Sequence, residues 1–146
     1  MLFQNEESSL KLEVIGYEFP ADCGDPRSDD RNWLVLRCTW QREDGVVLKD
    51  SNSCLLTYEL VEMTAGMKLV RSGIRDFYAS SFVEPYFELS LEKEDEGIFL
   101  LDLSFCLPNT MEDTDVANIS CRLTAEDLTN LVAELDRLCS EYPDRS

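Results

Sequence analysis

Apolar and polar residues alternate with a period of two in six segments of the chain, the pattern of β-strands that bury one face. In residues 32–41, for example, Leu34, Leu36 and Cys38 share the more apolar face, which we expect to point into the core. The six predicted strands are Leu10–Phe19, Asn32–Gln41, Val46–Leu48, Ser81–Lys93, Ile98–Leu107 and Val116–Leu123.

Two turns join neighbouring strands into antiparallel hairpins. Glu43-Asp44-Gly45 is a turn of the Asp-Gly type, a strong hairpin signal, and joins the second and third strands. The acidic segment Glu94–Gly97 turns the chain between the fourth and fifth strands. Gly16 marks a bulge or bend in the first strand.

A first helix is predicted after the turn-forming residues 49–53. Thr57 is its expected N-cap, Glu59 lies in the first turn, where its charge suits the positive end of the helix dipole, and Gly73 ends it. Gly66 opposes this helix with a propensity cost of about 1 kcal/mol. Apolar residues recur at helical spacing at Leu60, Met63, Met67 and Val70.

A second helix follows the last strand. Thr124 is its predicted N-cap, Glu126 and Asp127 lie in its first turn, and Pro143 stops it. Its apolar stripe consists of Leu128, Leu131, Val132, Leu135, Leu138 and Cys139.

The order β-β-β-α-β-β-β-α indicates an α+β fold. We expect two layers, a mainly antiparallel six-stranded sheet with both helices on one face, because strands and helices that each have one apolar side are satisfied by such a pair of layers. The 146 residues fit a single domain. We expect residues 1–8 to be frayed and 143–146 to form a tail.

Two polar segments are predicted to be exposed loops. Pro20–Asp30 is dense in Pro, Gly, Asp and Ser. Pro108–Asp115 carries Glu112, Asp113 and Asp115.

The net charge of −17 restricts the choice of partner. A surface this acidic repels phosphate backbones and anionic lipids, which leaves a basic protein partner or solubility alone as its purpose. No segment is apolar enough to span a bilayer, and the N-terminus lacks the pattern of a signal peptide. The six cysteines include no C-x-x-C pair, so we expect free, mostly buried thiols in the cytoplasm.

The residue types leave little room for catalysis. The chain contains no histidine, which excludes Ser-His-Asp and Cys-His catalysis and the usual zinc sites. Cys54, just ahead of the first helix, is the one candidate nucleophile, with a packed core thiol as the alternative. The carboxylates of Pro20–Asp30 lack the spacing of an EF-hand loop. We therefore expect no catalytic residue, no metal site and no cofactor.

Trp33 differs from the other aromatic residues. It follows the acidic loop directly and lies on the less apolar face of its strand, so it is either an exposed anchor for a protein partner or a packed side chain.

Four segments, taken in order, resemble the WapI-like family of bacterial immunity proteins. They are EVIGYEFP (13–20), DDRNWLVLR (29–37), SCLLTYELVEM (53–63) and FVEPYFEL (82–89). In the C-terminal part only LTAEDL (123–128) matches, and the segment DSNSCLLT departs from the family pattern around the helix start.

The resemblance implies a small, cytoplasmic, non-enzymatic protein that binds and neutralises the toxic C-terminal domain of a polymorphic toxin. Such toxins are often nucleases with basic clefts, which an acidic domain can meet with carboxylates and approach rapidly by electrostatic steering. Asn32, Thr57, Glu59, Glu84 and Pro85 then have structural roles. The residues expected to contact the toxin are Asp25, Asp29, Asp30, Trp33, Glu94, Asp95 and Glu96.

Two other functions stay open. One is a ligand-binding or divergent enzymatic domain with a pocket between the sheet and the helices, which a deep pocket lined by two or more carboxylates would favour. The other is a housekeeping protein whose acidity serves solubility.

Overall fold

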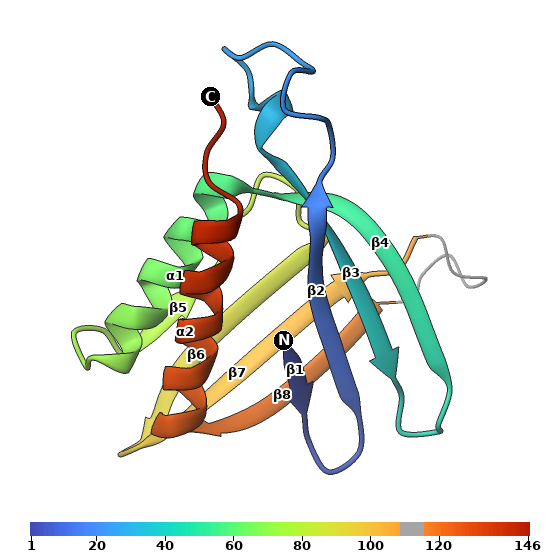
Figure 1. Cartoon of the computed structure of the whole chain (residues 1–146). Coiled ribbons are helices and arrows are strands. Elements are labelled where there is room, and N and C mark those ends of the chain that lie inside the picture. The colour runs from blue at the N-terminus through green and yellow to red at the C-terminus, as the bar shows by residue number, and fades with distance from the viewer. Residues whose placement is uncertain (109–115) are drawn as a thin grey trace.

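The computed structural model describes residues 1–108 and 116–146, and within them it shows an α+β fold of eight strands and two helices (Figure 1). The predicted loop residues Glu112, Asp113 and Asp115 lie outside the described residues. The elements are β1 (Leu2–Gln4), β2 (Ser9–Tyr17), the 3₁₀ turn η1 (Asp29–Asn32), β3 (Trp33–Gln41), β4 (Val47–Leu56), α1 (Thr57–Arg71), β5 (Phe77–Ala79), β6 (Phe87–Asp95), β7 (Ile98–Cys106), β8 (Val116–Thr124) and α2 (Ala125–Glu141).

The strands form two four-stranded antiparallel sheets, so the prediction of a single six-stranded sheet is wrong. The first sheet has the order β1-β2-β3-β4 and the second the order β5-β6-β7-β8. The prediction missed β1 and β5, which have three residues each, too few for an alternation to stand out. Phe3, in the segment expected to be frayed, pairs with Leu10 and is buried. Each sheet is followed by its own helix.

Strand β4 is longer than predicted and includes residues 49–53, which were expected to form a turn. Lys49 pairs with Thr39, Ser51 with Arg37 and Ser53 with Val35. Pairing along the whole of β3 satisfies the backbone of this segment, and this tertiary pairing outweighs the local turn preference of its Asp, Asn and Ser residues.

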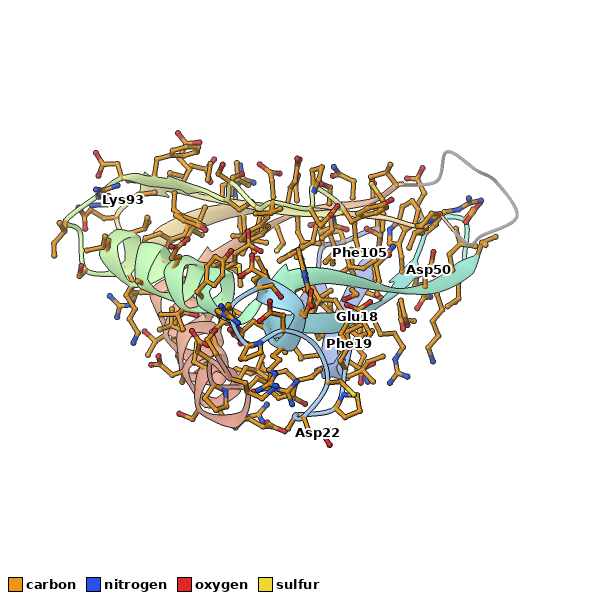
Figure 2. All side chains as sticks on the ribbon, turned by 90° about the horizontal axis from the view of Figure 1, so that it is seen from above. Glu18, Phe19, Asp22, Asp50, Lys93 and Phe105 are labelled. Carbon is orange, nitrogen blue, oxygen red and sulfur yellow. The ribbon has the colours of Figure 1, made fainter. Side chains whose placement is uncertain are left out.

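The second sheet forms one layer of the molecule, and its inner face contacts both the helices and the first sheet (Figures 1 and 2). Helix α1 contacts β5 and β6, helix α2 contacts β7 and β8, and the two helices pack against each other. Phe105, which is fully buried, lies between the two sheets. The alternating faces predicted from the sequence form the core, including Leu34, Leu36 and Cys38.

Helix α1 begins one residue from the predicted position, and a buried glutamate organises its start. Leu56 occupies the N-cap position, and the Oε1 atom of Glu59 accepts a hydrogen bond from the Leu56 N–H at 3.0 Å. The Oε2 atom of Glu59 accepts from the Val83 N–H at 2.9 Å. Glu59 is 3% exposed, so it joins the start of α1 to the segment before β6 inside the protein.

Gly66, which opposed the helix prediction, is required by a close contact. The ring of Tyr78 lies so near that a Cβ atom at position 66 would be 2.3 Å from the Tyr78 Cδ1 atom. The helix therefore accepts the propensity cost of glycine so that the aromatic ring of β5 can pack against its backbone.

Helix α2 matches its prediction. The Asp127 N–H donates to the Thr124 hydroxyl at 3.1 Å, and the Thr124 N–H donates to the Asp127 carboxylate at 3.0 Å. This reciprocal capping box satisfies two N–H groups that the helix itself leaves unpaired. Within residues 1–108 and 116–146, no helix is long and apolar enough to cross a membrane.

We predict that Glu59→Ala destabilises the fold by about 2–4 kcal/mol, because it leaves the Leu56 and Val83 N–H groups buried without acceptors. Glu59→Gln should lose less stability, since the glutamine side chain keeps one oxygen that accepts a hydrogen bond. Glu62→Ala, an exposed position on the same helix, is the matched control and should change stability by less than about 0.5 kcal/mol. Urea unfolding followed by circular dichroism measures all three; equal losses for Glu59→Ala and Glu62→Ala would contradict the bridging role.

We predict that Gly66→Ala destabilises the protein by about 1–3 kcal/mol through overpacking against Tyr78, although alanine is the better helix former. In a Tyr78→Ala background the sign should reverse, and Gly66→Ala should stabilise by up to about 1 kcal/mol. A double-mutant cycle by chemical denaturation measures this coupling. Additive effects of the two substitutions would show that the contact is not what selects glycine.

Candidate protein-binding surfaces

The predicted loop residues Asp25, Asp29 and Asp30 lie together between β2 and β3, and their carboxylates organise the loop. Asp25 Oδ1 accepts from the Arg27 N–H at 2.8 Å, and Asp30 Oδ2 accepts from the Asp25 N–H at 3.2 Å. The hydroxyl of Tyr58, on α1, donates to Asp29 Oδ2 at 3.3 Å. These carboxylates are exposed, but part of their hydrogen-bonding capacity is used inside the protein.

Trp33 is the first residue of β3 and is partly buried. Its carbonyl accepts from the Glu18 N–H at 2.9 Å, which joins the end of the acidic loop to its beginning. Its role as a contact for a partner stays a prediction.

Of the predicted tip residues, Glu94 and Asp95 end β6, and Glu96 begins the turn to β7. Arg122 of β8 donates to both carboxylate oxygens of Glu94, at 2.7 and 2.9 Å, and this hydrogen-bonded pairing lowers the pKa of Glu94. The Lys93 ammonium donates to Glu96 at 3.1 Å, and Asp95 accepts from the Glu96 N–H at 2.8 Å. Exposed pairs of this kind contribute little stability, but they neutralise part of the tip charge.

The structure does not bring the two predicted clusters together. The loop containing Asp25, Asp29 and Asp30 lies at one end of the molecule, and the β6–β7 turn lies at the opposite end (Figure 1). They belong to two separate surfaces.

The outer face of the second sheet carries a further acidic surface that the sequence analysis did not identify. Because Phe87, Leu89 and Leu91 point into the core, the alternate residues Glu88, Ser90 and Glu92 point outward. The cross-strand partner of Glu88 is Ser104, and that of Ser90 is Asp102. We call Glu88, Ser90, Glu92, Asp102, Ser104 and Asn118 the outer acidic face.

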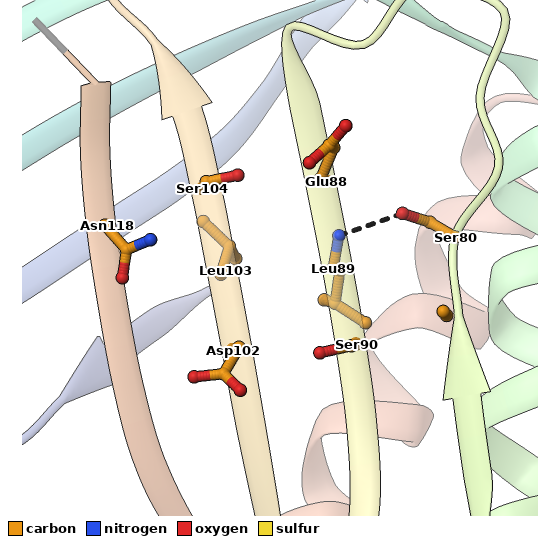
Figure 3. Close-up of a pocket in the computed structure, with 9 residues that line it drawn as sticks. Ser80, Glu88, Leu89, Ser90, Asp102, Leu103, Ser104 and Asn118 are labelled. Carbon is orange, nitrogen blue, oxygen red and sulfur yellow. Dashed lines mark hydrogen bonds between the residues drawn. The ribbon is translucent and has the colours of Figure 1, made fainter.

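The outer acidic face is hollowed but open. A depression of about 250 Å³ is lined by Glu88, Asp102 and Asn118 together with serine side chains, all on the solvent side of the strands (Figure 3). The Ser120 hydroxyl donates to Asp102. Among the described residues, no lysine or arginine forms an ion pair with Glu88 or Glu92. The alternation of apolar and polar residues in β6 and β7 is the sequence signal for this face. The polar half of such an alternation is also typical of any solvent-exposed side of a strand, so it does not by itself indicate a binding surface.

The outer face of the first sheet has the opposite charge. Lys11 and Lys49 are both cross-strand partners of Thr39, and Arg37 is the partner of Glu13. The Arg37 side chain donates to Glu13 at 3.3 Å, which lowers the pKa of Glu13. In a chain with 13 basic and 30 acidic residues, three cations thus lie on one face with a single carboxylate.

The described residues contain no feature of a metal site or an activated nucleophile. Within 1–108 and 116–146, no group of three or more Cys, Asp or Glu side chains is placed to hold a metal ion. Cys54 is fully buried, and desolvation, reinforced by the nearby Glu59 carboxylate, raises its pKa to about 12. The Cys54 sulfur therefore stays a protonated core thiol near neutral pH.

The fold and its surfaces define a small acidic α+β domain that presents exposed, charged surfaces around a closed core. Residues 1–143 match the model of the immunity protein WapI-like family, and the chain belongs to this family. This confirms the resemblance found in the sequence and extends it to almost the whole chain. No match to a curated protein is found.

Several solved structures share a distant likeness. The crystal structure of WHY1 from Arabidopsis thaliana is 13% identical, with 97% of this chain and 88% of that chain covered at a TM-score of 0.49. The plant transcriptional regulator PBF-2 is 16% identical, covering 97% and 80% at 0.49. A guide-RNA-binding protein complex bound to a gRNA is 9% identical, covering 88% and 87% at 0.43. Likenesses this distant carry no argument about function.

We predict that Cys23 is the fastest cysteine to react with a thiol reagent at pH 8, because it is exposed whereas Cys38, Cys54 and Cys121 are buried. Burial raises the pKa of Cys38 and Cys54 to about 12, so almost no thiolate exists there. Reaction with an aromatic disulfide reagent, mapped by mass spectrometry, measures this, and Cys23→Ser should remove the fast phase. Labelling of Cys54 as fast as Cys23 would restore it as a candidate nucleophile.

Proposed function

We propose that this protein neutralises a basic, nuclease-type toxin domain by stoichiometric, non-enzymatic binding, and that the toxin docks on the outer acidic face. Membership of an immunity-protein family supports a toxin as the general class of partner. The observation that supports a basic toxin is the carboxylate pair Glu88 and Glu92 on the outer face of the second sheet, where neither forms an ion pair with any residue of 1–108 or 116–146.

The charge distribution orients such a partner. The two outer sheet faces have opposite sign, so a basic protein approaching by diffusion is attracted to the second sheet and repelled from Lys11, Arg37 and Lys49 on the first. Steering of this kind raises the association rate, and carboxylates that meet arginine or lysine side chains then set the register of the complex.

The outer acidic face also suits a protein partner by its rigidity. Its carboxylates and serines project from paired strands, whose backbone is fixed on both sides, so little conformational entropy is lost when a partner binds. The tip residues Glu94, Asp95 and Glu96 extend this face at the β6–β7 turn, whereas Asp25, Asp29 and Asp30 at the other end contribute to the long-range field.

The alternative of a ligand-binding or enzymatic domain called for a pocket between the sheet and the helices. In the described part of the chain that space is filled by buried side chains such as Met63, Met67 and Leu135. The depression that does contain two carboxylates, Glu88 and Asp102, lies on the outside of the second sheet. A protein surface fits this arrangement better than a small substrate.

The direct test uses the purified C-terminal domain of a polymorphic toxin, sought among the genes next to the one for this protein. We expect a one-to-one complex whose dissociation constant, measured by calorimetry, rises with ionic strength because the contact is electrostatic. Inhibition of the toxin should be complete at equimolar protein and should show no turnover. A neutral or acidic toxin partner, or binding that is independent of salt, would contradict the proposal.

Charge reversal distinguishes the contribution of the outer acidic face to binding from the contribution of the protein's net charge. We predict that Glu88→Lys/Glu92→Lys weakens binding at least about tenfold, because two attractive contacts become repulsive. The matched control, Glu6→Lys/Glu43→Lys, makes the same change in net charge at exposed turns of the first sheet and should change affinity much less. Equal losses for both pairs would show that net charge acts without a defined surface.

A further inference from the structure

Residues 143–146, expected to form a tail, lie together with Tyr142 against the base of the acidic loop. The Tyr17 hydroxyl donates to the Pro143 carbonyl at 2.6 Å, and the Tyr17 and Tyr142 rings meet edge to face at 5.5 Å. The guanidinium of Arg145 stacks on the Tyr17 ring, with the Arg145 Cζ atom 3.5 Å from the centre of that ring. An aromatic side chain at the end of β2 thus receives the chain after α2.

Arg145 also binds two backbone carbonyls that belong to opposite ends of the acidic loop. Its Nη2 atom donates to the Phe19 carbonyl at 2.8 Å, and its Nε atom donates to the Arg31 carbonyl at 3.0 Å. Phe19 precedes the loop Pro20–Asp30, and Arg31 follows it. One side chain therefore closes the neck of the loop.

Asn32 holds the Arg145 backbone and the side chains of the residues on either side of it. The Asn32 side chain is 1% exposed; its amide nitrogen donates to Asp144 Oδ1 at 3.1 Å and to the Ser146 hydroxyl at 2.7 Å. Its amide oxygen accepts from the Arg145 N–H at 2.8 Å. A buried amide needs such partners, because its polar atoms are shielded from water.

We propose that Tyr17, Phe19, Arg31 and Asn32 form a binding site for an arginine-containing peptide segment, filled in cis by residues 143–146. Arg145 is the residue that fills this site, and the filled site holds the acidic loop in place. The site selects guanidinium: only a planar cation with several fixed N–H groups can stack on a ring while donating to two carbonyls at once, which the single ammonium of lysine does not reproduce.

The loop has the properties of a unit that hinges at this neck. Its interior is cross-linked by its own groups, such as Ser28 Oγ to the Asp25 carbonyl at 2.9 Å, and by the close approach of Gly24 to Asp30. Among the described residues, its further hydrogen bonds to the body include the Glu18–Trp33 backbone bond at the neck and the Tyr58–Asp29 contact at 3.3 Å. Loss of Arg145 removes two of the neck contacts together and leaves the internal network intact.

The test is hydrogen exchange on the full chain, with Arg145→Ala, Arg145→Lys and the control Arg27→Ala. Arg27 lies in the acidic loop and carries the same charge as Arg145, but its side chain is 93% exposed and, within residues 1–108 and 116–146, forms an ion pair with Asp25 alone, at 3.9 Å. We expect amides of residues 18–32 to exchange about tenfold faster or more in Arg145→Ala, from the loss of two charged hydrogen bonds, and no change in Arg27→Ala. Amides of β6 and β7 should exchange as in the wild type.

Chemical rescue distinguishes a guanidinium site from a general loss of stability. Millimolar ethylguanidinium should restore protection of residues 18–32 in Arg145→Ala with saturation, whereas ethylammonium should not, and Arg145→Lys should exchange as fast as Arg145→Ala. Wild-type exchange in the loop of Arg145→Ala, or equal rescue by both cations, would overturn the proposal. If Arg145→Ala does not fold, Arg145→Lys carries the same comparison, and wild-type protection in it would overturn the selectivity for guanidinium.

Discussion

The fold depends on one buried carboxylate that joins its two halves. Each half is a four-stranded sheet followed by a helix, and the chain passes from one half to the other through α1 and β5. Glu59 accepts hydrogen bonds from Leu56, at the end of the first sheet, and from Val83, in the approach to the second. Because a buried carboxylate is stable only when its oxygens are hydrogen-bonded, these two contacts fix the start of α1 and the direction of β6 together.

The same logic applies to Asn32, which is buried next to β3 and receives residues 144–146. Both Glu59 and Asn32 belong to segments that resemble the immunity-protein family in the sequence. Their side chains are enclosed by protein, and neither reaches a surface that a partner could touch. At these two buried positions the family motifs encode how the chain is assembled, whereas the proposed contacts with a toxin come from outward-facing side chains such as Glu88.

Strand alternation and helix capping predicted the α+β class, the hairpins, the core faces and α2, because these features are local or have a period that a single sequence displays. The number of sheets was not predictable in this way. Strands β1 and β5 depend on pairing with β2 and β6, for which their own three residues each give no local signal, and residues 49–53 become part of β4 because β3 lies beside them. The outer acidic face was hidden for a related reason: Glu88 and Asp102 are 14 positions apart and become neighbours only through the register of β6 and β7.

The separation of scaffold from surface has a physical consequence for specificity. Substituting Glu59 or Asn32 leaves buried polar groups without hydrogen-bond partners and lowers the stability of the fold. These positions therefore have little freedom to vary. Residues of the outer acidic face project into solvent from strands whose inner side chains already satisfy the core, so they can change with little effect on folding. On the proposed function, a single scaffold meets toxins of different surface chemistry by exchanging side chains on one side of β6, β7 and β8, and the opposite charge of the first sheet directs which side a basic partner reaches.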